Sequence, residues 1–399
     1  MTVLSSKAVI LGVTGSIAAY KAAELASTLT QSGALVDVVM TESAQRFISP
    51  ITMRAITHRP VAIDMWETPV NYEIEHISLA EAADALLVAP ATANIIAKLA
   101  NGLADDLLSA TALATKAPII IAPAMNDNMY SHPATQENIT RLRTRGVSFV
   151  EPDFGRLASG KMGRGRLAGL EEITGVLCAV LGREGDLAGW KVVITAGGTR
   201  EPLDPVRYLG NRSSGKMGFA LAVAARDRGA QVTLISAADC SSPAGVLVVP
   251  VDTASQMRDA VVDAVNVTDA LIMAAAVADY RATDVAVNKV KKSEEKWHIE
   301  LMRTPDILQS TRGPFIRIGF AAESEDLISN ARGKLVEKEL DLIVANDITE
   351  LGAGFAVDTN RVSIIGRDGV VETLPTLSKR EVADRILSAM VKMGKLQNS

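Results

Sequence analysis

Residues 190–218, WKVVITAGGTREPLDPVRYLGNRSSGKMG, lie at the midpoint of the 399-residue chain and decide how its second half folds. The apolar run at 191–195 predicts a buried strand that stops at Gly197-Gly198. A loop of about 18 residues follows, longer than ordinary strand-to-helix connections, and a helix is expected to begin near Lys216. This order opens a nucleotide-binding α/β unit. The N-terminus begins with the same order of strand, glycine turn and helix. The stretch therefore predicts the start of a second domain, with a functional site in its long loop.

The glycine-rich part of this stretch imitates a phosphate-binding P-loop. Residues 210–216, GNRSSGK, match that motif up to its last position, where Met217 replaces the Ser or Thr that would reach magnesium. We therefore do not expect an ordinary P-loop. A glycine-rich, basic helix start can still hold phosphate through its backbone N–H groups.

The composition, net charge and cysteine count limit the class of protein. Hydrophobic residues make up 48% of the chain, enough for two cores. The net charge of −5 argues against a nucleic-acid-binding face. Cys178 and Cys240 are the two cysteines, which argues against a disulfide framework and fits a reducing cytoplasm. With no signal-peptide pattern and no apolar run of about 18 residues, we expect a cytoplasmic protein with no membrane partner.

Both halves alternate predicted strands with predicted helices, which is typical of α/β domains with helices on both faces of a sheet. We expect domains at 1–189 and 190–399, with 182–189 as the linker. The strands expected are 8–13, 35–40, 86–91 and 118–124 in the first half, and 191–195, 231–236, 245–251, 270–276, 315–323, 342–347 and 361–365 in the second.

Three features of the first half are candidates for chemistry. Gly12-x-x-Gly15 lacks the third glycine of a dinucleotide fingerprint, so it is either a phosphate-binding turn or a plain tight turn. His76, at the start of a helical pattern, is either a base or a structural histidine. Residues 155–167, GRLASGKMGRGRL, predict either a mobile flap over a negative ligand or a solvated loop.

The second half adds acidic and basic candidates. Asp279, just past a strand, could hold a metal or a ribose, or could only cap a helix. The lysine cluster at 289–292 is either a binding site or a solvated face. Lys334 and Lys338 are four residues apart on an expected helix and so share one face.

Four segments of the first half resemble the flavin-dependent cysteine decarboxylases, which are flavodoxin-like proteins that hold FMN. They are residues 12–21, the His76 segment, residues 89–94 and Pro123-x-Met-Asn-x-x-Met129. Oxidation of the substrate thiol by the flavin supplies the electron sink that loss of CO₂ needs. The resemblance implies that His76 is the base and that Asn126 holds the substrate carboxylate. It further implies FMN contacts from Gly15, Ser16, Thr41, Thr92 and Asn94, and substrate contacts from Met125 and Met129.

Two positions depart from that family. Tyr130 stands where a Trp commonly follows the last Met, which keeps a flat ring with a polar edge. The flap usually reads Ala-Cys-Gly, and its Cys donates a proton after CO₂ leaves, whereas here it reads Ala158-Ser159-Gly160. A hydroxyl is a far weaker acid than a thiol, so we expect Ser159 not to be the sole proton donor.

The second half resembles the phosphopantothenate–cysteine ligases. The matching stretches are residues 196–204, 211–218, 274–279, 289–292, 305–308, 319–323 and 345–347. The resemblance implies that phosphopantothenate is activated by CTP as an acyl-cytidylate, with release of pyrophosphate, before cysteine displaces CMP. Asn211 would orient the acyl intermediate and Lys289 would neutralise charge beside Mg²⁺, whose ligands stay unassigned. CTP contacts are implied for Ala275, Asp279, Lys289, Pro305, Asp306, Ile307, Leu308, Phe320, Lys334 and Lys338.

Together these stretches follow the order of the bacterial bifunctional decarboxylase–ligases of coenzyme A biosynthesis. That family implies a flavodoxin-like first domain, a Rossmann-like second domain, and homo-oligomers with ligase dimers and trimer-based decarboxylase assemblies up to a dodecamer. Two alternatives are a flavodoxin-type electron carrier, in which His76 and Asn126 have no purpose, and an NAD(P) dehydrogenase, which needs the missing glycine fingerprint.

Overall fold

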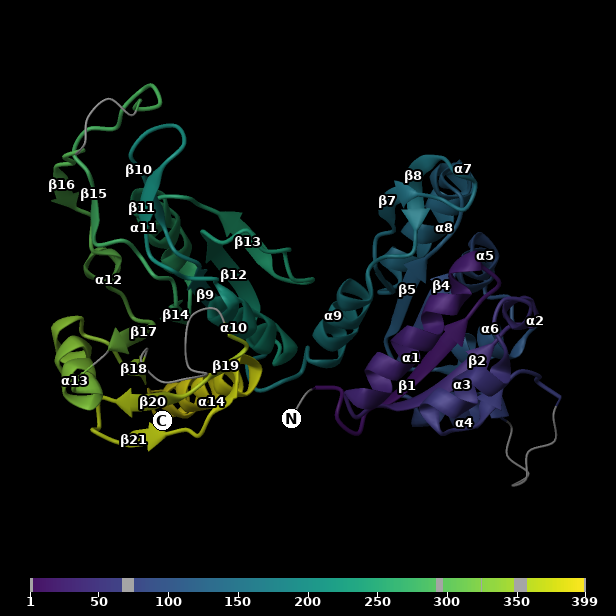
Figure 1. The fold of residues 1–399 in the computed structure, drawn as a ribbon. Coiled ribbons are helices and arrows are strands. Elements are labelled where there is room, and N and C mark those ends of the chain that lie inside the picture. Colours follow the sequence, from purple (N-terminus) through teal and green to yellow (C-terminus); the bar gives the residue numbers. More distant parts are fainter. Residues whose placement is uncertain (1–2, 67–74, 292–296, 324, 348–356, 398–399) are drawn as a thin grey trace. The chain divides into compact units, whose positions relative to one another are not determined.

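The structure is a computed structural model that describes residues 3–66, 75–291, 297–323, 325–347 and 357–397. Lys292 of the predicted lysine cluster lies outside these residues. The chain divides into two compact units, Met1–Gly182 and Arg183–Ser399, and each is described by itself (Figure 1).

The first unit is built on a six-stranded parallel sheet with the order β3-β2-β1-β4-β5-β6. Apart from the short edge strand β3, this is the flavodoxin-like order. Its strands are β1 (Ala8–Val13), β2 (Leu35–Met40), β3 (Val61–Ala62), β4 (Ala85–Ala91), β5 (Ile119–Pro123) and β6 (Ser148–Phe149), followed by the separate hairpin β7 (Asp153–Arg156) and β8 (Met162–Arg166).

Both faces of this sheet are apolar, so both need a covering layer. Val9 and Leu11 of β1 pack with α1 and α9, whereas Ile10 packs with α5, α6 and α8 on the opposite face. The predicted three-layer, flavodoxin-like fold is confirmed. The helices are η1 (Ile17–Tyr20, a 3₁₀ helix), α1 (Lys21–Gln31), α2 (Glu42–Gln45), α3 (Pro50–Thr57), α4 (Glu75–Ala82), α5 (Ala93–Asn101), α6 (Leu107–Ala114), α7 (Asp127–Ser131), α8 (Pro133–Thr144) and α9 (Leu170–Leu181).

The second unit contains an eight-stranded sheet with the order β13-β12-β9-β14-β17-β18-β20-β21. The first six strands are parallel, and β20 is antiparallel to both of its neighbours. The sheet strands are β9 (Lys191–Ala196), β12 (Gln231–Ser236), β13 (Leu247–Pro250), β14 (Ala270–Met273), β17 (Ile316–Glu323), β18 (Leu342–Asp347), β20 (Val362–Gly366) and β21 (Val371–Thr373). Small antiparallel pairs are formed by β10 (Arg200–Pro202) with β11 (Tyr208–Gly210), β15 (Tyr280–Ala282) with β16 (Leu301–Arg303), and β19 (Thr359–Asn360) with β22 (Leu377–Ser378).

Helices cover both faces of this second sheet as well. One face packs on α10 and α14, and the other on α11, α12 and α13 (Figure 1). The predicted Rossmann-like layering is confirmed. The helices are α10 (Lys216–Asp227), α11 (Ala254–Ala264), η2 (Val265–Val267, a 3₁₀ helix), α12 (Ile307–Ser310), α13 (Leu327–Glu337) and α14 (Lys379–Gln397). None of the helices in the described residues is long and apolar enough to cross a membrane.

Residues predicted as an interdomain linker pack into the second unit. Leu187 is fully buried in the core around β9 and α10. Its N–H donates to the carbonyl oxygen of Arg228 at 2.9 Å, and the Arg228 guanidinium pairs with Asp186 at 2.6 Å. The division of the chain therefore falls after Gly182, whereas the sequence analysis places it after Gly189.

Two segments expected to be irregular contain strands. The long loop after β9 holds the hairpin β10–β11, and residues 155–167 belong largely to the hairpin β7–β8. In β8 the buried positions are Gly163 and Gly165, so the alternation typical of a strand is present but carries no apolar side chains. The helical segment after β1 begins as the 3₁₀ helix η1 and continues as α1.

Candidate active sites of the two units

The residues expected to contact FMN lie where strands of the first sheet end. The carboxyl ends of parallel strands meet at one edge, where ligands bind. Gly15 and Ser16 follow β1, Thr41 follows β2, and Thr92 follows β4. The topology brings these four to one edge, and Asn94 is the exposed second residue of α5.

Hydroxyl groups tie these strand ends together. The Thr14 hydroxyl donates to the Pro90 carbonyl oxygen at 2.7 Å and accepts the Thr92 N–H at 3.1 Å. The Ser16 hydroxyl donates to the Ala124 carbonyl oxygen at 3.1 Å. The loops after β1, β4 and β5 therefore form one connected rim. Thr14 was missed by the sequence analysis, because only strand pairing brings it to its partners.

Three predicted site residues of this unit also cap α-helices. The side-chain oxygens of Thr41, Thr92 and Asn126 accept backbone N–H groups of α2, α5 and α7 at 3.3, 3.4 and 3.0 Å. Capping alone is a sufficient structural role for such side chains. The start of α5, the longest of the three helices, also offers N–H groups and a positive dipole end to an anion.

A small hollow borders Thr41. Its volume is about 140 Å³, and Met40, Glu42 and residues 63–66 and 105–108 form the rest of its wall. Pockets that hold cofactors or drug-sized ligands measure roughly 300 Å³ or more. The hollow does not by itself mark an FMN site, because Thr41 is the one predicted FMN contact that borders it.

His76 and Ser159 belong to other segments than this rim. His76 is the half-buried second residue of α4, which packs against α6. Ser159 is exposed in the turn between β7 and β8. In the part of the chain that the structure describes, no hydrogen bond joins either side chain to the rim.

The hairpin β7–β8 rests on the segment that carries Asn126. The Met125 N–H donates to the Gly165 carbonyl oxygen at 2.9 Å. A Cβ atom at Gly165 would lie 2.2 Å from the Met125 oxygen, and one at Gly163 would lie 2.7 Å from a carboxylate oxygen of Asp127. Only glycine permits this approach, so the base of the predicted flap is built against the predicted substrate-binding segment.

Tyr130 anchors the other end of that segment. Its hydroxyl donates to Glu151 at 2.8 Å, and Glu151 also pairs with Arg143. Burial and the Glu151 carboxylate raise the pKa of Tyr130 to about 12. The phenol is therefore neutral at physiological pH and remains a hydrogen-bond donor. Met129, one residue before it, is exposed.

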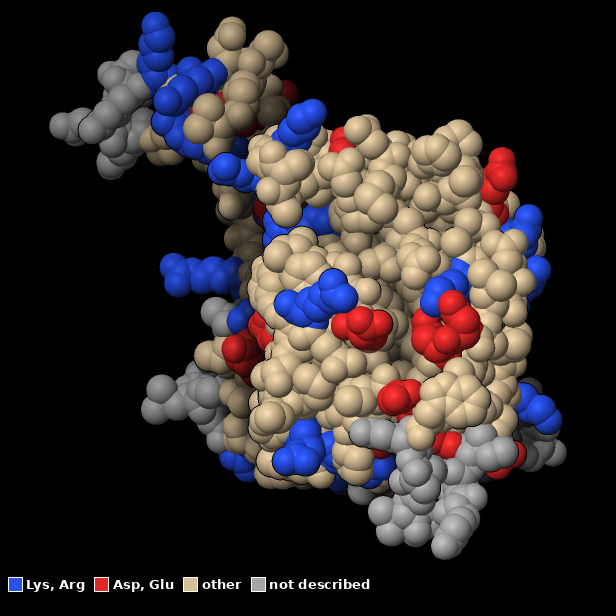
Figure 2. Space-filling model, turned by 90° about the vertical axis from the view of Figure 1, so that its right-hand side faces the viewer, with Lys and Arg blue, Asp and Glu red and all other residues tan. Residues whose placement is uncertain are grey.

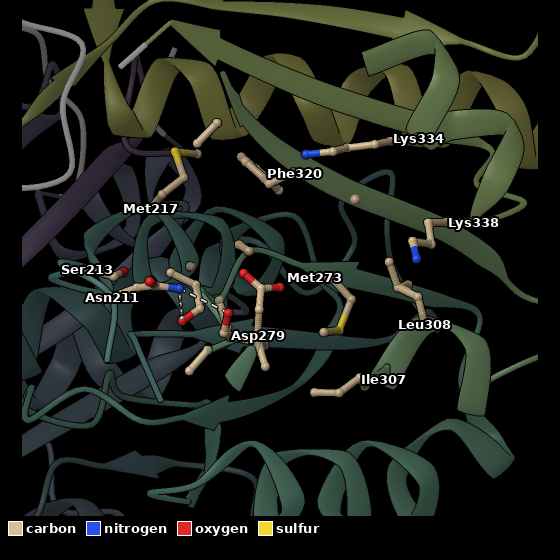
Figure 3. A pocket seen from close by; sticks show the side chains of 18 of the residues that line it. Asn211, Ser213, Met217, Met273, Asp279, Ile307, Leu308, Phe320, Lys334 and Lys338 are labelled. Carbon is tan, nitrogen blue, oxygen red and sulfur yellow. Dashed lines mark hydrogen bonds between the residues drawn. The ribbon is translucent and has the colours of Figure 1, made fainter. Parts of the chain in front are cut away.

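A cavity of about 1200 Å³ lies within the second unit. Lys334 and Lys338 border it from α13 and the residue after it, opposite Asn211 and Asp279 (Figure 3). The half-buried ring of Phe320 lies between these groups. The predicted residues that line the cavity are Asn211, Ala275, Asp279, Pro305, Asp306, Ile307, Leu308, Phe320, Lys334 and Lys338.

Asn211 and Asp279 are held by different means. The Asn211 amide donates to the Val277 carbonyl oxygen at 3.0 Å, which fixes its side chain at the wall (Figure 3). Asp279 is exposed and immediately precedes strand β15, so the helix-cap alternative for it is wrong.

Two buried threonines shape the same wall and were missed by the sequence analysis. Thr195 Oγ1 accepts the Ala275 N–H at 3.1 Å, and Thr199 Oγ1 accepts the Ala278 N–H at 2.9 Å. Thr195 pairs with Met273 in the ladder of β9 with β14, and Thr199 follows Gly198, which forms an isolated bridge with Ala276. A Thr at a strand end is too common a signal to be singled out beforehand.

Lys338 is engaged on one side by carboxylates. Its ammonium lies 2.7 Å from Asp306 and 2.9 Å from Glu337. These hydrogen bonds raise the pKa of Lys338. Burial opposes ionisation of Asp306, but Lys338 and the backbone N–H groups of Gln309 and Leu308 together outweigh it, and the pKa of Asp306 is lowered. Lys338 is therefore a fixed cation at the cavity wall, and Asp306 orients it.

Lys289 is the predicted ligase residue that the cavity wall does not include. It is exposed on the segment between β15 and β16. Asp204 holds this segment by accepting the Val290 N–H at 3.3 Å, and the Ala286 N–H donates to the Leu203 carbonyl oxygen at 3.1 Å. Within the described residues, no group of three or more His, Cys, Asp and Glu side chains is arranged to hold a metal ion.

These observations define a two-unit α/β protein with a flavodoxin-like unit followed by a Rossmann-like unit with a large polar cavity. The family models agree with this class. Residues 2–182 match the family described as Flavoprotein, and residues 187–393 match the DNA/pantothenate metabolism flavoprotein C-terminal domain.

The chain belongs to the family of bifunctional coenzyme A biosynthesis proteins. It is 47% identical to the coenzyme A biosynthesis bifunctional protein CoaBC of Bacillus subtilis (strain 168), covering 98% of both chains. It is 44% identical to the protein of that name from Vibrio cholerae, covering 97% of this chain and 98% of the other. It is accordingly a flavoprotein and a bifunctional enzyme of coenzyme A biosynthesis, with a decarboxylase and a ligase activity.

Two solved structures are similar to single parts of the chain. A crystal structure of the C-terminal domain of a CoaBC protein is 40% identical, with a TM-score of 0.46, and covers 54% of this chain and 100% of that one. A mutant PPC decarboxylase complexed with pantothenoylaminoethenethiol is 32% identical, with a TM-score of 0.40, and covers 43% of this chain and 96% of that one.

Proposed function

We propose that residues 190–399 contain the ligase and that its cavity joins phosphopantothenate to cysteine with CTP. The observation that carries this proposal is the single cavity that gathers ten of the predicted residues, with Asn211 and Asp279 facing the cations of α13 (Figure 3). The carboxylate of phosphopantothenate attacks the α-phosphate of CTP, which forms an acyl-cytidylate and releases pyrophosphate. The amine of cysteine then attacks the acyl carbon, which forms the amide and releases CMP.

The side chains suit the charges of this reaction. A carboxylate that attacks a triphosphate needs cations to offset the repulsion. Lys334 and Lys338 supply them, and Lys289 adds a third if its segment bends toward the cavity. Phe320, Asp279 and residues 305–308 contact the nucleoside. Mg²⁺ would be held chiefly by the phosphates of CTP, as is usual for this ion.

Asn211 orients the acyl-cytidylate for attack by cysteine. Its amide is already fixed against the wall beside Val277. Asn211→Asp keeps the shape but puts a negative charge beside the mixed anhydride. With labelled CTP, the variant should accumulate acyl-cytidylate and form little amide. Normal turnover would remove Asn211 from the reaction, and absence of CTP-dependent pyrophosphate release in the native enzyme would contradict the proposed reaction itself.

We also propose that residues 1–189 are the decarboxylase of the ligase product, phosphopantothenoylcysteine, and that the flavin is FMN. The fit rests on the rim: a Cβ at Gly15 would lie 2.4 Å from the Ser43 side chain, so the turn is closed and compact, and the α5 start offers donors for a phosphate. Bound FMN supplies the oxidation of the substrate thiol. His76 removes the proton of the substrate thiol, and Asn126 holds the substrate carboxylate. Met125 and Met129 flank the substrate.

The oligomer is part of this proposal. The trimer-based assembly that the resemblance implies would place FMN between subunits, with a second chain contributing part of the wall of the site. Uncharged residues cover most of the face of the first unit drawn in Figure 2. Large apolar side chains are exposed in both units, among them Ile17, Tyr20 and Ile51 in the first and Tyr208 and Val287 in the second. Trimers of the first unit and dimers of the second would cover such surfaces, and a cytoplasmic location follows from the pathway.

Light scattering tests the assembly. We expect the flavin-loaded protein to be a multimer of three chains or more. A monomer that binds FMN tightly would contradict the shared site while leaving the decarboxylase assignment open to a direct assay of CO₂ release.

A further inference from the structure

Arg317 is a buried arginine near the start of β17. Only 5% of the residue is exposed, and it is not among the residues that line the ligase cavity. Its guanidinium donates through Nη2 to the carbonyl oxygen of Leu308 and through Nη1, at 3.2 Å, to the carbonyl oxygen of Glu339. Its backbone N–H donates to the Asp341 carboxylate at 2.8 Å. One side chain therefore joins α12 to the segment that follows α13.

A charged side chain is an unfavourable choice for this buried position. A buried guanidinium needs partners for its five N–H groups, and each one left unpaired is costly. Within the described residues, the Nε–H of Arg317 has no hydrogen-bond partner. Burial lowers the pKa of Arg317, and the Glu339 and Asp341 carboxylates only partly oppose this effect. Because an apolar side chain would avoid these penalties, stability alone does not explain an arginine here.

Both carbonyl oxygens that Arg317 binds belong to elements that reach the cavity. Leu308 is the second residue of α12 and lines the cavity, and Glu339 directly follows Lys338, which also lines it. On the cavity side, the Asp306–Lys338 ion pair at 2.7 Å joins the same two elements. Figure 3 shows Lys338 and Leu308 on one side of the cavity. Arg317 and this ion pair thus tie α12 to the end of α13 at two points.

The backbone after Lys338 is strained and has to be held in place. Glu339 has φ 52°, in the left-handed region that glycine usually occupies at the end of a helix. Strained backbone persists only where its surroundings fix it, and it is frequent at functional sites. Arg317 and Arg367 both donate to the Glu339 carbonyl oxygen, Arg367 at 2.7 Å. The two guanidiniums therefore hold the residue at which the chain turns after Lys338.

We propose that Arg317 is a positioning residue of the ligase, which holds α12 and the turn at Glu339 so that Lys338 meets the phosphates of CTP. The inference rests on the proposed function, in which Lys338 offsets the charge of CTP and residues 305–308 contact its nucleoside. Groups that bind one ligand together must be held to within about 0.5 Å. Without the guanidinium, both carbonyl oxygens lose a donor, and the cation and the nucleoside contacts no longer fit one nucleotide.

Steady-state kinetics of the full-length enzyme test this role, with CTP and cysteine varied in turn. We expect Arg317→Met to raise the KM of CTP about tenfold, the loss of one charge-assisted contact, and to leave the KM of cysteine near native. Arg317→Lys keeps the charge but replaces the forked donor with one ammonium, so its KM for CTP should lie between the two. Partial unfolding would lower the amount of active enzyme, and hence the maximal rate, without changing KM.

Two further variants serve as controls. Leu187→Ala destabilises the second unit at a buried position outside the cavity wall and should leave the KM of CTP unchanged. Arg367→Met removes a guanidinium that holds the same turn. In the part of the chain that the structure describes, no hydrogen bond joins Arg367 to α12, so its KM for CTP should rise less than that of Arg317→Met. Thermal denaturation identifies the folded variants, and Arg317→Lys carries the test if Arg317→Met does not fold.

The KM values of CTP decide between a positioning role and a structural one. An unchanged KM in the folded Arg317 variants would overturn the inference, and so would an equal rise in Leu187→Ala. An equal rise in Arg367→Met would show that the turn alone sets the position of Lys338, and it would overturn the bridge to α12. In all these cases the native ligase still uses CTP. A native enzyme that does not use CTP would contradict the proposed function and the inference together.

Discussion

Asp204 is a buried carboxylate that holds the segment carrying Lys289, a lysine that lies outside the cavity wall. Its side chain is fully buried and accepts the N–H groups of Val206 and Arg207, both at 2.8 Å, and of Val290 at 3.3 Å. Burial opposes ionisation, but these donors outweigh it and lower the pKa of Asp204. One side chain thus joins the turn after β10 to the segment that carries Lys289.

We expect Asp204→Asn to slow CTP-dependent pyrophosphate release by about tenfold, because the neutral amide loses the charge-assisted bonds that hold this segment. Lys289→Gln should slow it more. If Asp204 acts through Lys289, the double variant should be no slower than Lys289→Gln alone. Fully additive losses would show that Asp204 acts elsewhere. Because its folded pKa is below the unfolded value, its contribution to stability is present at neutral pH and is lost as pH falls below about 4.

Ser159 raises the question of which group protonates the decarboxylated product. It is exposed at the tip of the β7–β8 turn, with Lys161 two residues away. The thiol of a Cys there would have a pKa of roughly 8.5, far below that of a hydroxyl. We expect the native enzyme to complete decarboxylation with water or Lys161 as donor.

Single-turnover absorbance with phosphopantothenoylcysteine distinguishes the possibilities. The native enzyme should bleach and then recover its yellow colour, and Ser159→Cys should recover at least as fast. Permanent bleaching in the native enzyme together with recovery in Ser159→Cys would mean that Ser159 marks a stalled reaction. Ligase turnover in the same preparation controls for folding.

At the scale of single residues, the sequence pointed to side chains that line the cavity, but not to those that hold the cavity wall in place. Asn211 and Asp279 belong to recognisable stretches, Lys334 was singled out by its spacing from Lys338, and all three line the cavity. Thr195 and Lys379 line or support it from strand and helix ends without any local pattern. Their roles depend on contacts between segments far apart in the chain, which no local spacing encodes.

Among the elements, the hairpin β7–β8 depends most on glycine. A Cβ at Gly165 would lie 2.2 Å from the Met125 oxygen, and the residue has φ 153°. We expect Gly165→Ala to shift the segment that carries Asn126 and to lower decarboxylase turnover at least about tenfold, in line with the effect of misplacing a binding group by 1 Å.

The bifunctional chain provides controls for this variant. Ligase turnover should be unchanged, because Gly165 belongs to the other unit. Gly169→Ala, at an open position before α9, should leave both activities near native. Native decarboxylase turnover in Gly165→Ala would show that the hairpin base does not position Asn126.

The same hairpin shows why some elements could not be predicted. Strands β1, β4 and β9 are apolar runs and were expected within one or two residues of their observed bounds. In β8 glycines fill the buried positions, so no hydrophobic period exists to detect. Buried, apolar sheets can be read from sequence, whereas strands stabilised by close backbone contact cannot.

At the scale of the whole molecule, the cut between the units decides which fragments are stable. Residues 183–399 retain Leu187, which is fully buried, and the hydrogen bond of its N–H to Arg228. Residues 190–399 lack both. Burial of a leucine is worth about 1.5–3 kcal/mol, and one backbone hydrogen bond adds about 1 kcal/mol. The partly exposed Asp186–Arg228 pair adds little to this difference.

We therefore expect residues 183–399 to fold alone with ligase activity and to melt roughly 5 °C or more above residues 190–399. Leu187→Ala in the longer fragment isolates the side chain and should give an intermediate melting temperature, because the backbone hydrogen bond remains. Differential scanning calorimetry at equal protein concentration makes the comparison, since a dimer's stability depends on concentration. Equal melting temperatures for the two fragments would show that residues 183–189 contribute nothing to the second unit, and an inactive but folded 183–399 fragment would contradict the separation of the two activities.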